Sequence, residues 1–392
     1  MLIGLVGAPS AGKSTFFKAA TLSDVEIASY PFTTISPNRG AAFVKINCVD
    51  KEFNKQCNPR EGFCINHKRF VPVELMDVAG LVPGAHKGLG MGNQFLNDLN
   101  QADVLIHIVD ISGKTNTKGE AVENHNPLEN IRFLEDEINF WFHGLISKNW
   151  DKFARTAKQE KQELYKALFK QLSGLKVTEE IAKEAIKSFN PDPTQWSEGD
   201  VLALAKKLRQ LTKPIIIAAN KFDSPGSFEN YEKAKQEFKE SIIIPCSAES
   251  ELALREATKK DLIDYIPGEN DFIIKKDLTE QQKKGLEFIK ENILNKLGNT
   301  GIQETLNKAV FDVLKYIAVF PGGVGKMEDS HGRVLADCFL LPKGTTALDF
   351  AYKLHTDIGK KFIKAIDVKT RQIIAKDYQL KHRDVIEIKT NA

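Results

Sequence analysis

The chain has 392 residues, of which 42% are hydrophobic and 27% are charged, and its net charge is +3. This composition fits a soluble protein of two or three domains. No run of about 18 apolar residues occurs, which excludes a membrane-spanning helix and makes a membrane partner unexpected. The first apolar run begins at Leu2 and leaves no room for a signal peptide, and five cysteines, an odd number, argue against a disulfide scaffold. We therefore expect a cytoplasmic protein in a reducing compartment.

The positive charge is unevenly distributed along the chain. Residues 316–392 hold 13 Lys or Arg against 9 Asp or Glu, so this segment carries all of the basic surplus. Such a surplus is compatible with an anionic partner such as RNA and equally with an ordinary solvated surface.

Short apolar runs recur along the chain, with turn or helix signals between them. Buried strands separated by helical segments predict an α/β fold with a doubly wound, mostly parallel sheet. Ligands of such a sheet bind at the carboxyl ends of its strands. The runs lie at residues 2–6, 41–46, 71–76, 104–109, 215–219 and 242–244.

Apolar residues at three- and four-residue steps mark a helical insertion between residues 113 and 212. About four amphipathic helices are expected there, some of them paired as a short coiled-coil hairpin. Ser197, followed three residues later by Asp200, predicts the start of one helix. The aromatic cluster at 140–142 favours a place in a helix core over a binding face.

A helical stretch near 279–297 leads out of this fold, and the chain becomes β-rich after residue 323. A strand within 334–341, a helix at 346–355 and strands at 362–368 and 385–388 predict a small α+β domain. The expected boundaries are 1–112 and 213–268 for the two parts of a nucleotide-binding domain, 113–212 for the insertion, 269–315 for a helical connector and 316–392 for the C-terminal domain.

Residues Gly7 to Ser14 form the pattern G-x-x-x-x-G-K-S directly behind the first strand. The two glycines let successive backbone amides converge on phosphate oxygens, and a helix that begins at Lys13 adds partial positive charge. Lys13 supplies a cation for the outer phosphates and Ser14 a hydroxyl for Mg²⁺. A glycine-rich turn without a ligand is the alternative. The residues expected to bind phosphate are Ala8, Pro9, Ser10, Ala11, Gly12, Lys13, Ser14 and Thr15.

Two further segments complete the expected phosphate and magnesium site. Asp77 and Gly80 form a D-x-x-G pattern after the third strand, where Asp77 can hold Mg²⁺ through water and the Gly80 amide can reach the γ-phosphate. In the segment that begins at Tyr30, Thr33 or Thr34 can close over Mg²⁺ and the γ-phosphate and release them after hydrolysis.

The pattern N-K-x-D at 220–223 selects the base. The Asp223 carboxylate only accepts hydrogen bonds, and guanine offers it two neighbouring donors, whereas adenine offers an acceptor there. The stem of Lys221 would lie along the base, and Asn220 would tie this loop to the phosphate loop. Ser247 and Ala248, after the next strand, would close the site through backbone amides. A chance surface loop is the alternative.

These motifs resemble those of the Obg family of GTPases, most closely its YchF-like branch. The resemblance rests on residues 7–14, 30–40, 77–96 and 341–357 and covers nearly the whole chain. It implies a P-loop NTPase G domain with an α-helical insertion and a C-terminal TGS domain. It also implies Mg²⁺-dependent hydrolysis of a nucleoside triphosphate and association with ribosomes or translation factors, and it favours Thr34 over Thr33. We expect Lys13, Thr34 and Gly80 to act in catalysis and Ser14, Thr34 and Asp77 to hold Mg²⁺.

Three positions depart from relatives or from other GTPases. The YchF branch has a degraded base motif and prefers ATP, whereas the motif at 220–223 is intact and indicates GTP. Ser10 stands where many relatives have an asparagine linked to potassium, which argues against K⁺ activation. Leu81 occupies the place of the water-orienting glutamine of Ras-like GTPases, so slow intrinsic hydrolysis is expected. His86 could orient water instead, or be an exposed loop histidine.

Three cysteines and a histidine lie close together in the sequence, at Cys48, Cys57, Cys64 and His67. Their spacing lacks the close cysteine pair of ordinary zinc sites and therefore disfavours a zinc ion.

Three functions fit the sequence. The first is a switch GTPase that binds GTP and GDP and acts on a ribosomal partner or ribosomal RNA. The second is an ATPase regulator of YchF type. The third is a non-catalytic RNA- or ribosome-binding adaptor that keeps nucleotide for stability. The sequence does not indicate an oligomeric state.

Overall fold

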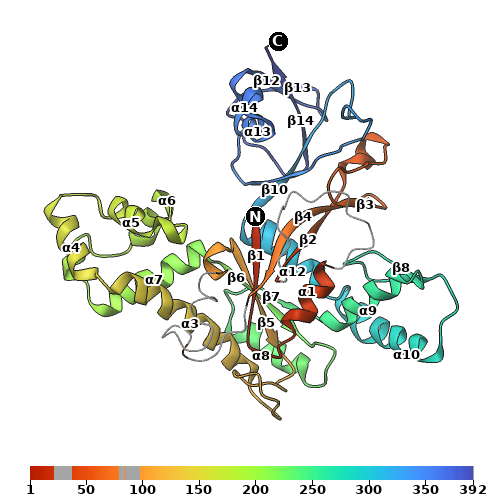
Figure 1. The fold of residues 1–392 in the computed structure, drawn as a ribbon, viewed down its shortest axis with the longest axis horizontal. Helices are drawn as coiled ribbons and strands as arrows, with labels where there is room; N and C mark the ends of the chain where they lie inside the picture. The colour runs from red at the N-terminus through yellow and green to blue at the C-terminus, as the bar shows by residue number, and fades with distance from the viewer. Residues whose placement is uncertain (22–37, 79–83, 85–97, 392) are drawn as a thin grey trace. The chain divides into compact units, whose positions relative to one another are not determined.

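The computed structural model describes residues 1–21, 38–78, 84 and 98–391, and these form two compact units (Figure 1). The first unit contains Met1–Phe17 and Leu75–Ser250, and the second contains Lys18–Glu74 and Glu251–Ala392. None of the described helices is long and apolar enough to span a bilayer.

The strands of the first unit belong to a mostly parallel sheet, as the apolar runs predict. Strands β1 and β5 are buried on both faces, which is why they have nearly continuous apolar sequences rather than an alternating pattern. Strands β1, β5, β6 and β7 pair in parallel in this order, and Ile3 lies opposite Val104. The whole sheet has the order β2-β4-β1-β5-β6-β7, with β3 paired to β4. The bounds are β1 Leu2–Val6, β2 Arg39–Asn47, β3 Phe63–Ile65, β4 Lys68–Asp77, β5 Val104–Asp110, β6 Ile215–Asn220 and β7 Ile243–Pro245.

The helical insertion is built from five α-helices rather than about four within the described part of the chain. The apolar pattern between 153 and 172 is divided into α4 and α5, because the chain turns between them at Lys161, where φ is 50°. Ser197 and Asp200 form the expected reciprocal cap of α7. The helices are α3 Pro127–Ser147, α4 Trp150–Gln159, α5 Leu164–Leu172, α6 Glu179–Ile186 and α7 Glu198–Thr212, and α8 Ser227–Glu237 follows β6.

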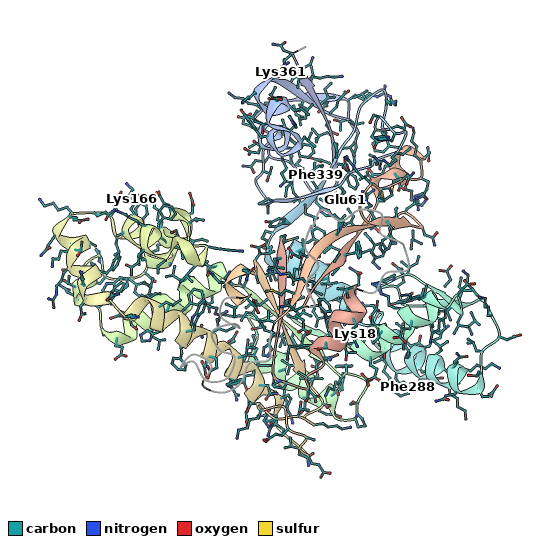
Figure 2. All side chains as sticks on the ribbon, viewed as in Figure 1. Lys18, Glu61, Lys166, Phe288, Phe339 and Lys361 are labelled. Atoms are coloured by element: carbon teal, nitrogen blue, oxygen red, sulfur yellow. The ribbon has the colours of Figure 1, made fainter. Side chains whose placement is uncertain are left out.

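One apolar cluster joins these helices to the sheet. Phe142 of α3 is fully buried with Leu204 and Leu208 of α7, and the same cluster includes Val6 and Leu105 of the strands. Its neighbour Phe140 is 43% exposed, so the expectation of a helix core holds for Phe142 and not for Phe140. Charged side chains such as Lys166 on α5 lie on the exposed surface (Figure 2).

The second unit contains a hairpin, a helical connector and a five-stranded sheet. Thr279 caps α10 with Gln282, and the helix continues through a π-helical turn at Lys290–Leu294. The sheet order is β11-β10-β14-β12-β13, in which only the β10 and β14 pair is parallel. Helix α13 buries Phe350 against this sheet. The elements are β8 Ile263–Tyr265, β9 Phe272–Ile274, α10 Glu280–Ile289, α11 Asn295–Leu297, α12 Ile302–Lys308, β10 Tyr316–Pro321, β11 Phe339–Pro342, α13 Ala347–Leu354, α14 Thr356–Lys360, β12 Phe362–Asp367, β13 Gln372–Ile374 and β14 Asp384–Thr390.

Helices α1 Lys13–Thr21 and α9 Ala248–Lys259 each contain a boundary between the two units, as does β4. Several apolar residues of the C-terminal sheet form its own core, among them Phe339, which is labelled together with the exposed Lys361 in Figure 2.

Candidate nucleotide-binding site

The loop after β1 has the geometry of a phosphate-binding loop. The Lys13 ammonium donates hydrogen bonds to the carbonyl oxygens of Gly7 (3.0 Å) and Ala8 (2.9 Å), so it lies across the mouth of the loop. Burial lowers the pKa of Lys13, and the nearby Asp77 carboxylate opposes this shift. The amine nevertheless keeps an anionic neighbour and several carbonyls, which favour its charged form.

The glycines of this loop stand where a side chain has no room. Gly7 and Gly12 have φ values of +150° and +98°, and a Cβ atom on either would lie 2.3 Å from a neighbouring atom. At Gly7 that atom is the carbonyl oxygen of Ile108, and at Gly12 it is the Asn220 amide nitrogen. Ser10 also has a positive φ of 60°. The loop therefore curls tightly over the carboxyl end of the sheet, where its amides can converge on an anion.

Ser14 and Asp77 form the pair that could hold a magnesium ion. The Ser14 hydroxyl donates to Asp77 Oδ2 at 3.1 Å, although 63 residues separate them. Burial raises the pKa of Asp77, while the hydrogen bond from Ser14 and the positive charge of Lys13 act against that shift. A hydroxyl and a carboxylate oxygen at this distance fit the hard-oxygen donor set of Mg²⁺. Thr33, Thr34, Gly80, Leu81 and His86 lie outside the described residues, so the roles expected for them stay predictions.

Asn220 connects the phosphate loop to the expected base site. Its amide nitrogen donates to the Ala11 carbonyl oxygen at 2.9 Å, and its Oδ1 accepts from the Ala248 amide at 3.0 Å. The side chain is 2% exposed, so these bonds are made in a low-dielectric environment. Three segments that are far apart in sequence, 7–14, 220–223 and 246–248, are brought together through this one residue.

The carboxylate of Asp223 is positioned by a hydroxyl. The Ser247 hydroxyl donates to Asp223 Oδ1 at 2.7 Å, which leaves the second carboxylate oxygen to face a base. Ser250 Oγ lies 2.7 Å from Ser247 Oγ and helps to fix its orientation. Every residue expected at the base that the structure describes thus belongs to one hydrogen-bonded loop cluster.

Asp110 is a site residue that the sequence analysis missed. It is completely buried at the end of β5, and its Oδ2 accepts from Lys221 Nζ (2.8 Å) and Thr115 Oγ1 (2.8 Å). Burial alone would raise the pKa of Asp110, but bonds from Lys221, Ser112 and Thr115 outweigh it and hold the pKa below its ordinary value. Its position directly after a buried parallel strand was the available signal, because such ends meet at the ligand edge of the sheet.

A loop that follows β5 covers the phosphate loop from one side. A Cβ atom on Gly119 would lie 2.5 Å from the Pro9 Cβ, so only glycine permits this close approach. This contact could not be predicted from the sequence, because it depends on the path of a loop without an apolar pattern.

These features define a P-loop nucleotide-binding protein of the GTPase class. Residues 2–137 match the family model of the 50S ribosome-binding GTPases, and residues 218–323 match that of the Obg-like GTPase YGR210-like, G4 motif-containing domain. Residues 325–390 match the TGS domain. An uncharacterized GTP-binding protein of Methanocaldococcus jannaschii is 50% identical over 388 residues, covering 99% of this chain and 98% of the relative. The chain belongs to the Obg family of GTP-binding proteins, in its YchF-like branch.

More distant relatives and solved structures agree with this assignment. The ribosome-binding ATPase YchF of Bacillus subtilis is 28% identical over 391 residues, covering 95% of this chain and 89% of the relative. A crystal structure of a GTP-binding protein from Pyrococcus horikoshii is 38% identical, with a TM-score of 0.80 and full coverage of both chains. The Schizosaccharomyces pombe YchF GTPase, 20% identical with a TM-score of 0.59 and coverage of 99% and 97%, shares the fold. The predicted fold class, with its helical region and TGS domain, is confirmed.

Proposed function

We propose that this protein is a Mg²⁺-dependent GTPase that hydrolyses GTP to GDP and phosphate and acts as a switch on the ribosome. The observation that carries the base preference is the Asp223 carboxylate, held by Ser247 at 2.7 Å inside the loop cluster that Asn220 organises. A fixed carboxylate accepts two hydrogen bonds from guanine. With adenine it would face another acceptor, so that neither group would have a hydrogen-bond partner.

Residues of this chain would bind the phosphates and the magnesium ion. Lys13 and the amides of residues 8–15 would neutralise the β- and γ-phosphates, and Ser14 and Asp77 would orient the magnesium ion. When bound, Mg²⁺ supplies charge neutralisation at the phosphates. Thr34 and Gly80 are proposed to contact the γ-phosphate side. Leu81 cannot orient water by hydrogen bonding, so we expect slow hydrolysis without a partner.

Binding of GTP and ATP in competition tests the base preference. Wild-type protein should bind GTP at least about 100-fold more tightly than ATP, since losing hydrogen bonds at a buried base site costs several kcal/mol. Asp223→Asn should weaken GTP binding and favour xanthosine triphosphate, because the exchanged amide matches the additional carbonyl of xanthine. Equal or tighter ATP binding by the wild type would overturn the base assignment.

An ATPase of YchF type is the second candidate, because relatives such as the B. subtilis protein bear the name of ribosome-binding ATPase. Steady-state turnover of both nucleotides separates the two candidates, with Mg²⁺ removal by chelation expected to abolish either activity. Turnover that stays at zero with ribosomes present would instead support a non-catalytic adaptor.

The ribosomal partner is proposed from the names of relatives and from the basic surplus of residues 316–392. Co-sedimentation of the full chain with ribosomes should be stronger with a non-hydrolysable GTP analogue than with GDP. Asp223→Asn should lose this dependence on the GTP analogue and regain it with the matching xanthosine analogue. This rescue separates a nucleotide-controlled interaction from electrostatic adhesion, which would be the same in every nucleotide state and would contradict the switch.

A further inference from the structure

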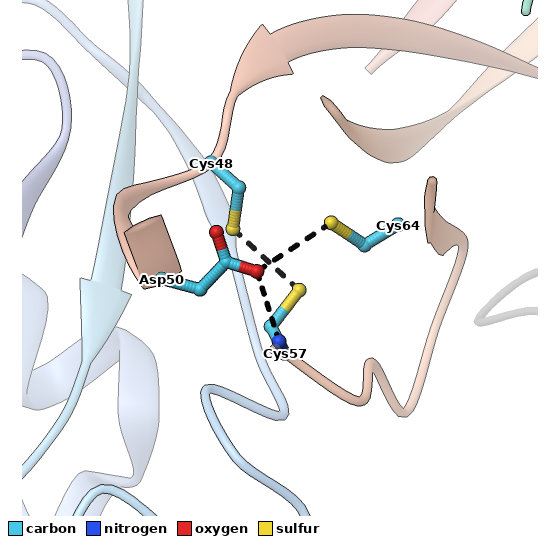
Figure 3. A group of neighbouring side chains, drawn as sticks. All are labelled: Cys48, Asp50, Cys57 and Cys64. Carbon is cyan, nitrogen blue, oxygen red and sulfur yellow. Dashed lines mark hydrogen bonds between the residues drawn. The ribbon is translucent and has the colours of Figure 1, made fainter. Parts of the chain in front are cut away.

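Three thiols and a carboxylate converge in the second unit, in the segment that joins β2 to β4. The ligand atoms of Cys48, Asp50, Cys57 and Cys64 all lie within 4.8 Å of one another (Figure 3). Cys48 Sγ is 3.5 Å from Cys57 Sγ, and Cys64 Sγ is 3.8 Å from Asp50 Oδ2. Asp50 is fully buried, and Cys48 and Cys57 are nearly so. Four potential anions therefore face one another, three of them buried and Cys64 half-buried.

Two of the six separations among these atoms match the edges of a tetrahedral zinc site. With Zn–S bonds of about 2.3 Å and a Zn–O bond of about 2.0 Å, the edges of a ligand tetrahedron are roughly 3.5–3.8 Å long. The two separations given above lie in this range. Three thiolates with one carboxylate form a donor set that suits zinc, which accepts both soft sulfur and oxygen ligands.

The surroundings orient the carboxylate and balance the charge. His67 Nδ1 lies 2.9 Å from Asp50 Oδ1, which directs the other oxygen, Oδ2, toward the thiols. A histidine behind a ligating carboxylate is the kind of supporting contact that metal sites use. The Arg69 guanidinium, itself buried, donates to Cys57 Sγ at 3.6 Å and offsets part of the negative charge.

A disulfide does not account for this cluster. None of the five cysteines forms a disulfide, and the 3.5 Å between the Cys48 and Cys57 sulfurs exceeds an S–S bond of about 2.05 Å. A disulfide between these two would also leave Cys64 and the buried Asp50 carboxylate without a function, whereas a cation uses all four groups.

We propose that Cys48, Asp50, Cys57 and Cys64 bind one Zn²⁺ as a closed structural site. The sequence spacing disfavoured zinc because no two of the cysteines form a close pair and because Asp50 was not considered as a ligand. A hollow of about 390 Å³, lined by Cys48, His67 and Arg383 among others, reaches the cluster from the surface and provides an entry path.

The site fixes a loop that contacts the chain near and within the TGS domain. Arg69 donates to the carbonyl oxygens of Leu335 and Ala336, both at 3.0 Å. The Asn58 amide donates to the Val334 carbonyl oxygen at 2.9 Å. The loop itself contains only a 3₁₀ turn at Val49–Phe53 and the three-residue strand β3, so it has little secondary structure to hold this shape. Zinc would supply that rigidity.

Ion pairs extend the same contact to the TGS domain. Glu52 pairs with Lys369 at 2.8 Å and with Arg383, and Lys55 pairs with Glu328 at 2.6 Å. The proposed metal therefore holds the β2–β4 loop in the conformation in which these ion pairs form.

Metal analysis of the purified full-length protein tests the proposal. Protein produced with zinc in the medium and purified without chelators should contain about one zinc ion per chain. Cys57→Ser and Asp50→Ala should each lower the zinc content at least about tenfold, since each removes one of four ligands. Cys246→Ser removes a buried thiol outside the cluster and should retain the metal. Less than about a tenth of a zinc ion per wild-type chain, or a Cys48–Cys57 disulfide in the peptide map, would overturn the site.

A second measurement covers variants that fail to fold. Wild-type protein reconstituted with Co²⁺ should show the absorption of a tetrahedral cobalt–thiolate centre, and an octahedral spectrum would refute the proposed geometry. Removal of zinc by a strong chelator should raise backbone hydrogen exchange in residues 48–69 and 328–337 by about tenfold or more. Unchanged exchange in both segments would refute the role of the metal in holding the loop.

Discussion

The nucleotide site of the first unit and the cysteine cluster of the second unit are assembled in different ways. The nucleotide site combines short contiguous motifs, each placed at the carboxyl end of a strand, such as 7–14 after β1 and 220–223 after β6. The cysteine cluster draws its members one at a time from an irregular loop. A tight backbone turn dictates the spacing of residues within a motif. The convergence of side chains in an irregular loop depends instead on contacts with distant parts of the chain. The contiguous motifs therefore reveal their site in the sequence, whereas the cysteine cluster reveals its thiols but not the Asp50 carboxylate that lies among them.

Arg69→Met should produce the largest effect, because it tests whether distant contacts hold the dispersed site. The exchange removes two donors to buried carbonyls 266 and 267 residues away, at Leu335 and Ala336, and should lower the free energy of unfolding by about 3 kcal/mol. Arg60→Met is the matched control, since its ion pair with Asp337 is half exposed and contributes under about 1 kcal/mol. Urea unfolding of the full chain measures both. Equal losses of unfolding free energy for the two variants would show that the buried arginine contacts contribute no more than the exposed ion pair.

Gly12→Ala should produce the next largest effect, since it disturbs a contiguous motif without touching its charged groups. Alanine would be strained at a φ of +98°, and its Cβ would displace the Asn220 amide from the loop. A cost of about 2–3 kcal/mol corresponds to a loss of GTP affinity of roughly 30- to 150-fold. Gly144→Ala, at an exposed helical position with free space around it, should leave affinity unchanged. Calorimetric titration decides, and an unaffected Gly12→Ala would show that the loop tolerates another conformation.

His107→Leu should give the smallest of the three effects. It tests how burial of a histidine in the sheet beneath the phosphate loop affects stability. Burial, with a smaller contribution from Lys13, lowers the pKa of His107 from 6.5 to about 3. The folded state thus favours the neutral form of His107. The contribution of this group to the free energy of unfolding is complete above pH 6.5 and is lost as the pH falls toward 3. At pH 5 the loss is about 2 kcal/mol relative to pH 8. His107→Leu should remove this part of the pH dependence, as measured by unfolding of both proteins across that range. A variant with the wild-type slope would assign the pH dependence to other groups.

Much of the fold could be predicted because long buried strands have distinctive sequences. The expected strand at 104–109 corresponds to β5 Val104–Asp110, and the expected helix start at Lys13 is the first residue of α1. Strands β8 and β9 were missed, although the equally short β7 was found from its apolar run at 242–244. β10 was missed as well, since it begins three residues after a π-helical turn that masks the change of pattern.

The candidate site was predictable to the same extent and for the same reason. Asn220, Lys221 and Asp223 fall in one motif, and the structure brings them to the loops at 7–14 and 246–248. Asp110 was missed because a single carboxylate has no spacing from which a role can be inferred. Asp50 was missed because its importance arises only when Cys57 and Cys64 fold back onto it.

The hydrogen bond from Asn220 to Ala11 can form only late in the synthesis of each chain. These residues are 209 positions apart, and synthesis at about 5–20 residues per second takes roughly 10–40 s to cover that distance. Both strands beside β1 in the sheet, β4 and β5, precede β6 in the chain, so β1 can pair before Asn220 has been made. The phosphate loop of a nascent chain is therefore made well before the Asn220 side chain that ties it to the base loop.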